Sequence, residues 1–232
     1  MCTVVLRVPE SPSGDILLLA VRDEDPARPW RPLGAWWPDH PGVTGIQDEL
    51  AGGAWLAHTD QRVAVLLNRA GGADIAAPTS RGGLVLGAVT GARLPDPLTT
   101  LGFNLVEASS SGARVTSWEG GAPRVSELTP GTHMIAHDDL DDPGTARVAA
   151  WRQRFADTPT SGRPWWSGWL DALAQTTRAV DPRDDRAIIR DNRPHGFPTL
   201  SLLVCLVSLG PAGLSATMAT LERPGHWNSL AL

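Results

Sequence analysis

The sequence contains neither lysine nor tyrosine, although it has 232 residues and 20 side chains in the lysine-plus-arginine class. All 20 are therefore arginine. The absence of lysine excludes a lysine Schiff base, a pyridoxal-phosphate aldimine, a phosphate-loop lysine and the strand lysine of a protein kinase. The absence of tyrosine excludes a tyrosine general acid or base. The same bias is typical of a GC-rich genome, which we take as its origin.

Cysteine, long apolar runs and excess basic charge are also scarce. Cys2 and Cys205 are too few for a disulfide framework. The longest apolar run, residues 200–209, contains two serines and is too short to span a bilayer. The net charge of −5 argues against a nucleic-acid or anionic-membrane partner. No signal peptide is visible. We therefore expect a cytoplasmic protein with no nucleic-acid partner and no membrane insertion.

The apolar and turn residues predict antiparallel strand pairs. The sequence shows 42% hydrophobic and 19% charged residues, no internal repeat and no linker, so we expect one domain over residues 1–232. Apolar runs separated by turn residues predict three strand pairs: 3–8 with 16–21, 54–58 with 62–68, and 199–209 with 214–221. Further strands are expected at 102–108, 113–118 and 124–128. Residues 25–45, rich in Pro and Trp, are interpreted as one long loop of functional importance.

Helical spacing occurs in three places. Ser80 is expected to cap a helix over residues 84–89. A second helix is expected from about Thr145, with one apolar face. A third follows Pro164, interpreted as a first-turn proline. The apolar residues of the second and third helices are Val148, Trp151 and Phe155, and Trp166, Trp169, Leu170 and Leu173. Strand pairs around a helical block predict an α+β domain with antiparallel sheets.

Cys2 is the first candidate catalytic residue. If Met1 is removed, Cys2 carries both a thiol with a pKa of about 8.5 and an α-amine with a pKa of about 7.7–8.0. A nucleophile and its base would then share one residue. Position alone also fits an ordinary strand that begins Met-Cys-Thr, and the sequence leaves both interpretations open.

Several short motifs occur in a fixed order after Cys2. They are Val21-Arg22-Asp23-Glu24, Arg28-Pro29, Trp36-Trp37, Gly52-Gly53-Ala54-Trp55-Leu56, Leu67-Asn68, Ser80-Arg81-Gly82 and Gly102-Phe103-Asn104-Leu105. In this order they resemble the motifs of the NRDE family, also called the transport and Golgi organisation family. The match is specific over residues 1–110 and looser beyond them.

The resemblance implies a fold and a set of catalytic residues. The family is similar to the N-terminal-nucleophile hydrolases, which are four-layer αββα sandwiches, and within them to cysteine-type cholylglycine hydrolases and penicillin acylases. Cys2 would then attack an amide or thioester carbonyl, and Arg22 would favour its thiolate. Asp23 would orient the α-amine or Arg22, and Asn68 would donate to the oxyanion. Candidate substrate-binding residues are Trp36, Trp37, Trp55, Arg81, Asn104 and His137.

The chain also departs from the family pattern at three positions. Val21 stands where the family has Asn, and His137 ends a segment where the family has Leu-Ser-Asn. Pro198 stands where the family motif Tyr-Gly-Thr-Arg has its arginine. Arg193 is the nearby candidate to replace that arginine.

Other interpretations concern metals and ligand binding. His133 and His137 precede an Asp-rich run at residues 138–142, which fits either a metal cluster or a solvated acidic loop; we expect the loop and no metal. The family has been linked to haem trafficking and to lipid or coenzyme A metabolism. The alternative to a hydrolase or acyltransferase is therefore a non-catalytic carrier or chaperone that binds haem or an acyl-CoA. Without tyrosine, its haem ligand would be Cys2, a His or a Met. A retained fold with an unrelated role is the third interpretation.

Overall fold

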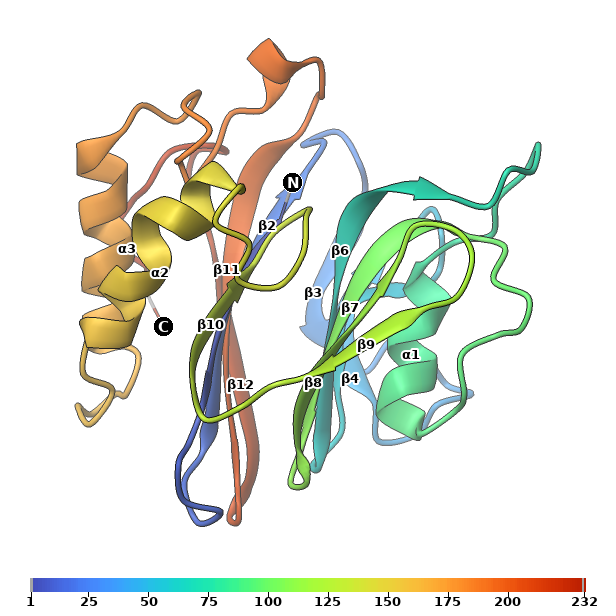
Figure 1. Ribbon diagram of the computed structural model, residues 1–232, viewed down its shortest axis with the longest axis horizontal. Coiled ribbons are helices and arrows are strands. Elements are labelled where there is room, and N and C mark those ends of the chain that lie inside the picture. The colour runs from blue at the N-terminus through green and yellow to red at the C-terminus, as the bar shows by residue number, and fades with distance from the viewer. Residues whose placement is uncertain (1, 231) are drawn as a thin grey trace.

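The computed structural model describes residues 2–230 and residue 232 (Figure 1). Within these residues the chain forms two antiparallel sheets and three α-helices, which confirms the α+β class. None of the described helices is long and apolar enough to cross a membrane.

The first sheet has five strands in the order β10-β1-β2-β11-β12. Their bounds are β1 Thr3–Val8, β2 Ile16–Glu24, β10 Gly131–Ile135, β11 Leu200–Gly210 and β12 Gly213–Thr220. The second sheet has seven strands in sequence order from β3 to β9. Their bounds are β3 Trp30–Gly34, β4 Thr44–Asp48, β5 Ala54–His58, β6 Arg62–Gly72, β7 Leu101–Ser109, β8 Gly112–Trp118 and β9 Arg124–Glu127.

The helices cover the outer faces of the sheets (Figure 1). They are α1 Gly82–Thr90, α2 Ala146–Asp157 and α3 Ser167–Ala179, and a 3₁₀ turn spans Arg193–His195. Helices α2 and α3 pack on the five-stranded sheet, whereas α1 packs on β5, β6 and β7. The central apolar layer lies between the two sheets.

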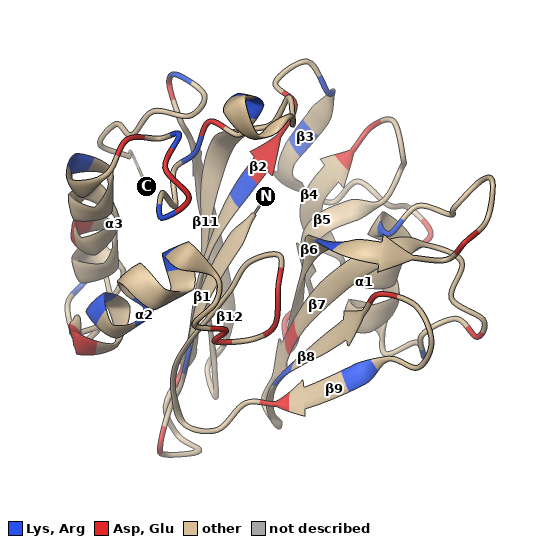
Figure 2. Cartoon of the chain, turned by 45° about the horizontal axis from the view of Figure 1, so that its top comes forward, with Lys and Arg blue, Asp and Glu red and all other residues tan. Residues whose placement is uncertain are grey.

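The side-chain alternation of β2 sets the position of the candidate site. Leu18 and Ala20 pack in the central layer, whereas Leu19 and Val21 pack toward α2 and α3. Continuing this alternation places Arg22 on the side of the central layer and Asp23 on the side of the helices. The charged end of β2 is visible beside the N-terminus in Figure 2.

The three strand pairs predicted from the sequence are confirmed as β1–β2, β5–β6 and β11–β12. The interpretation of residues 25–45 as one long loop is wrong, because β3 lies within it and β4 begins at its end. Strand β3 is five residues long, only partly buried and irregular in register, so its sequence has no clean alternation. Strand β10 was not predicted for a similar reason: it is short, and Gly131, Thr132 and His133 give it no alternating apolar pattern.

The starts of two helices also differ from expectation. Helix α1 begins with Arg81 as its N-cap, and Ser80 contributes by accepting the Gly82 N–H at 3.2 Å. Helix α3 begins at Ser167, so Pro164 precedes the helix and does not lie in its first turn.

Candidate active site

The β1–β2 hairpin places Cys2 at one end of the layer between the sheets. Thr3 pairs with Val21, so Cys2 lies beside the end of β2. The Asp23 N–H donates to Cys2 Sγ at 3.4 Å, and the thiol donates to the Asp23 carbonyl at 3.7 Å. Cys2 is 8% exposed. Two backbone contacts therefore fix the sulfur at the rim of the core.

Cys2 lines a cavity of about 290 Å³, which we name the Cys2 cavity. Its wall includes three of the predicted site residues, Asp23, Asn68 and His137, together with Phe197. Asn68 is exposed on β6 opposite Phe103, and His137 follows β10. Four segments far apart in sequence thus converge beside the thiol.

Burial raises the pKa of the Cys2 thiol, and the charge of Asp23 raises it further. Arg22 acts in the opposite direction, but its effect on this pKa is smaller. The pKa of Cys2 is therefore raised overall, whereas the sequence led us to expect that Arg22 would lower it and favour the thiolate. The resting sulfur is therefore a neutral thiol near neutral pH, and it must lose its proton as it reacts.

The Asp23 carboxylate is held by residues from the end of the chain. It accepts from Ser201 Oγ at 2.5 Å and from Asn192 Nδ2 at 3.2 Å. Arg190 Nε donates to Asn192 Oδ1 at 2.7 Å and so fixes the amide. Asp23 and Ser201 are register partners in the β2–β11 pairing. This pairing links the carboxylate beside Cys2 to a buried polar network.

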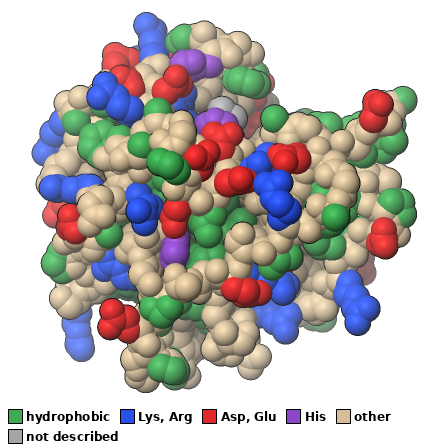
Figure 3. Space-filling model, viewed as in Figure 1, with side chains coloured by type: hydrophobic (Ala, Val, Ile, Leu, Met, Phe, Trp, Pro, Cys, Tyr) green, Lys and Arg blue, Asp and Glu red, His purple; other side chains and the backbone are tan. Residues whose placement is uncertain are grey.

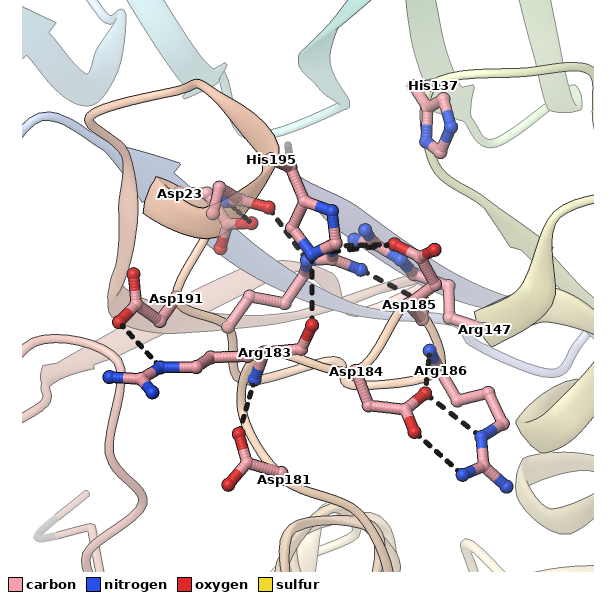
Figure 4. Close-up of polar contacts among 12 residues, drawn as sticks. Asp23, His137, Arg147, Asp181, Arg183, Asp184, Asp185, Arg186, Asp191 and His195 are labelled. Atoms are coloured by element: carbon pink, nitrogen blue, oxygen red, sulfur yellow. Dashed lines mark hydrogen bonds and ion pairs between the residues drawn. The ribbon is translucent and has the colours of Figure 1, made fainter.

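Arg147 on α2 completes the network from the helical side. Its Nη1 donates to Thr3 Oγ1 at 2.9 Å, and the side chain is 1% exposed. Burial and then the charge of Arg190 lower its pKa to about 10, whereas Asp23 acts in the opposite direction. Figure 4 shows Asp23 and Arg147 together with Asp185 and His195; the charge of Asp185 also acts on Arg147, and Asp185 lies 3.7 Å from His195 Nε2.

Arg22 lies toward the seven-stranded sheet and away from the Cys2 cavity. It is 2% exposed, and its guanidinium lies 5.9 Å from the ring centroids of both Trp30 and Trp55. Its Nη2 is 3.4 Å from Glu24 Oε2. Arg22 lines a second cavity of about 380 Å³. Glu24 and Asn68 line both cavities, so the two are neighbours.

Comparison with known protein families matches residues 1–183 to the family described as Transport and Golgi organisation 2. The chain belongs to this family. A search of curated proteins gives no match. The Transport and Golgi organisation 2 match covers Cys2, Asp23, Asn68 and Arg147. It ends before the segment 190–201, from which Asp23 receives its hydrogen bonds.

The structure separates the six residues that were predicted to bind substrate. Trp55 and Arg81 line the second cavity, and His137 lines the Cys2 cavity. Trp36 and Trp37 line neither cavity. Their indole N–H groups donate to the Pro32 and Gly52 carbonyls, at 2.6 and 2.7 Å respectively.

Asn104 is fully buried and acts as a tether in the described structure. Its Nδ2 donates to the carbonyls of Ala136 and Asp138, at 3.3 and 2.8 Å. These contacts hold the segment that carries His137 against β7. Asn104 therefore supports the Cys2 cavity without lining it.

Arg193 does not replace the family arginine at the site. Its guanidinium donates two hydrogen bonds to Asp191, at 2.7 and 2.8 Å, and its side chain is 60% exposed. This pairing lowers the pKa of Asp191 to about 2. The buried arginines on the helical side of the site are instead Arg147 and Arg190. The sequence pattern did not reveal them, because arginine is mostly exposed in proteins and their burial depends on packing between distant segments.

The His and Asp residues after β9 form ordinary polar contacts. His133 Nδ1 is 2.7 Å from Asp141 Oδ2, and His133 Nε2 is 2.8 Å from the Thr129 carbonyl. Among the described residues, no group of three or more His, Cys, Asp or Glu side chains is placed to hold a metal ion. His137 instead faces the Cys2 cavity, with Nε2 3.2 Å from Asp138 Oδ2.

Proposed function

We propose that this protein is a cysteine-dependent acyl hydrolase or acyltransferase that acts on an amide or thioester of a small acylated substrate. The main support for this proposal is that Cys2 lines a cavity together with Asp23, Asn68 and His137. The proposal requires removal of Met1, which lies outside the described residues. The α-amine of Cys2 would then be the only amine in the chain apart from guanidinium and histidine groups.

In the proposed reaction the α-amine takes the thiol proton as sulfur attacks the substrate carbonyl. A neutral thiol needs such a base, because burial disfavours a preformed thiolate. The Asn68 amide would donate to the oxyanion, and Asp23, held by Ser201 and Asn192, would orient the α-amine. The ammonium then returns the proton to the leaving amine or thiolate. Water or another acceptor finally releases the acyl group from sulfur.

The arrangement of layers supports this proposal. Helices α2 and α3, the five-stranded sheet, the seven-stranded sheet and α1 follow one another (Figure 1). We propose that this order is the αββα sandwich of the N-terminal-nucleophile hydrolases. In that arrangement the nucleophile would lie at one end of the inner layer, which is where Cys2 is found.

A panel of short N-acyl and S-acyl probes tests the proposal. Replacing Cys2 by Ala should abolish turnover of any probe that the parent protein cleaves. Cys205→Ala is the matched control, because Cys205 is fully buried in β11 and does not line the cavity. Undiminished turnover by the Cys2→Ala variant would contradict the proposal.

The carrier hypothesis for haem or an acyl-CoA is the second candidate. It is favoured by the second cavity, where arginines and Trp55 provide charge and an aromatic surface. Titration of the parent protein with haem and with an acyl-CoA tests this candidate, since a carrier would bind its ligand and leave it intact, whereas a hydrolase would cleave the acyl-CoA. Absence of saturable binding by either ligand would remove this candidate.

A further inference from the structure

The second cavity differs from the Cys2 cavity in the charge of its walls. It is lined by Arg22, Arg28 and Arg81 against two carboxylates, Glu24 and Asp48. We name it the arginine cavity. The Cys2 cavity is lined by four carboxylates and one arginine: Asp23, Glu24, Glu119, Asp138 and Arg69. Two adjoining cavities thus have opposite electrostatic character, which favours opposite ends of a polar ligand.

The carboxylates of Glu24 and Asp48 do not neutralise all of the positive charge in the arginine cavity. Arg28 Nε is 2.7 Å from Asp48 Oδ2, which is a close pair. Arg81 forms no ion pair with a described residue, and its Nη1 donates to the Gly102 carbonyl at 2.8 Å. Burial lowers the pKa of Arg81. A partly buried cation with only a neutral acceptor favours a bound anion.

Two further side chains at this cavity carry donors that lack hydrogen-bond acceptors. Within the described residues, Arg22 Nε and Nη1 and Trp55 Nε1 are buried without a partner. The Arg22 guanidinium is stabilised by two indole faces, but its contact with Glu24 is long. Buried donors without acceptors are rare in native proteins and point to a missing polar partner.

The start of helix α1 lies in the same wall. Ser80, Arg81 and Gly82 line the cavity, and the first turn of the helix carries no acidic residue. Backbone N–H groups and the helix dipole favour an anion at this end. The close approach of α1 to β5 depends on glycine, because a methyl group on Gly53 would lie 2.5 Å from the Gly82 carbonyl carbon.

We propose that the arginine cavity is an anion-binding site for a carboxylate or phosphate group of the ligand. Arg81, the start of α1 and Arg28 would contact the anion, and Arg22 would provide a fixed charge behind them. Because Glu24 and Asn68 line both cavities, one ligand can place this anion here and a carbonyl at Cys2. That orientation rests on the proposed function, whereas the anion site itself does not.

Isothermal titration calorimetry of the full chain at low ionic strength tests the site, with inorganic phosphate and succinate as separate probes. The Cys2→Ala background prevents turnover. We expect saturable binding of at least one probe, weakened about tenfold or more by Arg81→Gln, since a charge-assisted hydrogen bond contributes about 1.5–3 kcal/mol. A preference for phosphate or for succinate would identify the source of the anion, and either preference supports the site.

Arg114→Gln is the matched control, because it removes the same charge from an arginine 49% exposed that pairs with Glu107 outside both cavities. It should change the affinity less than about twofold. If Arg81→Gln does not fold, Arg28→Gln makes an independent removal of cavity charge, with the same expected weakening. No saturable binding by either probe, or equal weakening by the Arg114 and cavity variants, would overturn the proposal.

These outcomes separate the anion site from the catalytic proposal. Cys2-dependent turnover without anion binding would overturn the anion site alone. Anion binding with turnover that survives Cys2→Ala would overturn the catalytic proposal alone.

Discussion

Three arginines, Arg22, Arg147 and Arg190, are at most 2% exposed. A buried charge costs several kcal/mol unless neighbouring groups compensate it. Arg190 receives this compensation from Asp185 and Asn192, whereas Arg22 contacts the indole rings of Trp30 and Trp55. The planar guanidinium suits both arrangements, since it donates in several directions and stacks on rings.

The histidines should titrate in a definite order. The hydrogen bond that His133 donates to the Asp141 carboxylate raises the pKa of His133, whereas burial lowers the pKa of His58 and of His137. An NMR pH titration should therefore give His133 the highest pKa of the three. His133 stabilises the fold below its unfolded pKa of about 6.5, and this contribution is lost as the pH rises through the higher folded pKa.

Replacing Asp141 by Asn should bring the pKa of His133 down and flatten this pH dependence. A pKa of His133 equal to that of His137 in the parent protein would contradict the assignment of the Asp141 contact.

The two cysteines should differ in their reaction with iodoacetamide. Cys2 lines a cavity, whereas Cys205 is fully buried and burial raises its pKa to about 12. Mass spectrometry of peptides should show alkylation of Cys2 alone in the folded protein. The rate should keep rising above pH 9, because the pKa of Cys2 is also raised. Equal labelling of both cysteines would contradict the burial of Cys205.

At the scale of elements, the contact between β5 and α1 is sensitive to one methyl group. Gly53→Ala should lower the free energy of unfolding by about 1–3 kcal/mol, because the new Cβ meets the backbone of Gly82. Gly83→Ala is the control, since a Cβ there meets nothing within 4 Å and alanine favours the helix by roughly 0.5–1 kcal/mol. Denaturant unfolding measures both changes, and equal effects would contradict the proposed close approach.

The Asn104 tether predicts a local change in dynamics. Asn104→Ala removes the donor to two backbone carbonyls beside His137, and an unpaired buried acceptor costs about 1–3 kcal/mol. Hydrogen exchange should accelerate in residues 134–139 and stay unchanged in β12. Gln153→Ala on the exposed face of α2 is the control. Unchanged exchange at residues 134–139 would contradict the tether.

The sequence predicts those elements whose formation depends on neighbouring residues in the chain. The pair β1–β2 has apolar runs on both sides of a turn, so its hairpin is readable in sequence. Strand β3 is not, because it is short and irregular and is stabilised by its pairing with β4. Ser201 could not be assigned to the site either, since its contact with Asp23 depends on the register between strands 178 positions apart.

On the scale of the whole molecule, the candidate site brings together segments that are far apart in the sequence. Cys2 directly precedes β1, Asn68 and His137 come from the middle of the sequence, and Asn192 and Ser201 come from its last fifth. The family motifs predicted Cys2, Arg22, Asp23 and Asn68 together, whereas the structure places Arg22 in a second cavity, apart from Cys2 and Asp23. The surface view shows acidic and arginine side chains interspersed on the visible face, with no continuous basic patch there (Figure 3).

The most direct test of Cys2 as nucleophile is the intact mass of the protein after brief incubation with a short acyl thioester. We predict a chain that lacks Met1 and gains the mass of one acyl group. This adduct should be absent in Cys2→Ala and present in Cys205→Ala. A chain that retains Met1, or an adduct that persists in Cys2→Ala, would contradict acyl transfer by the N-terminal cysteine.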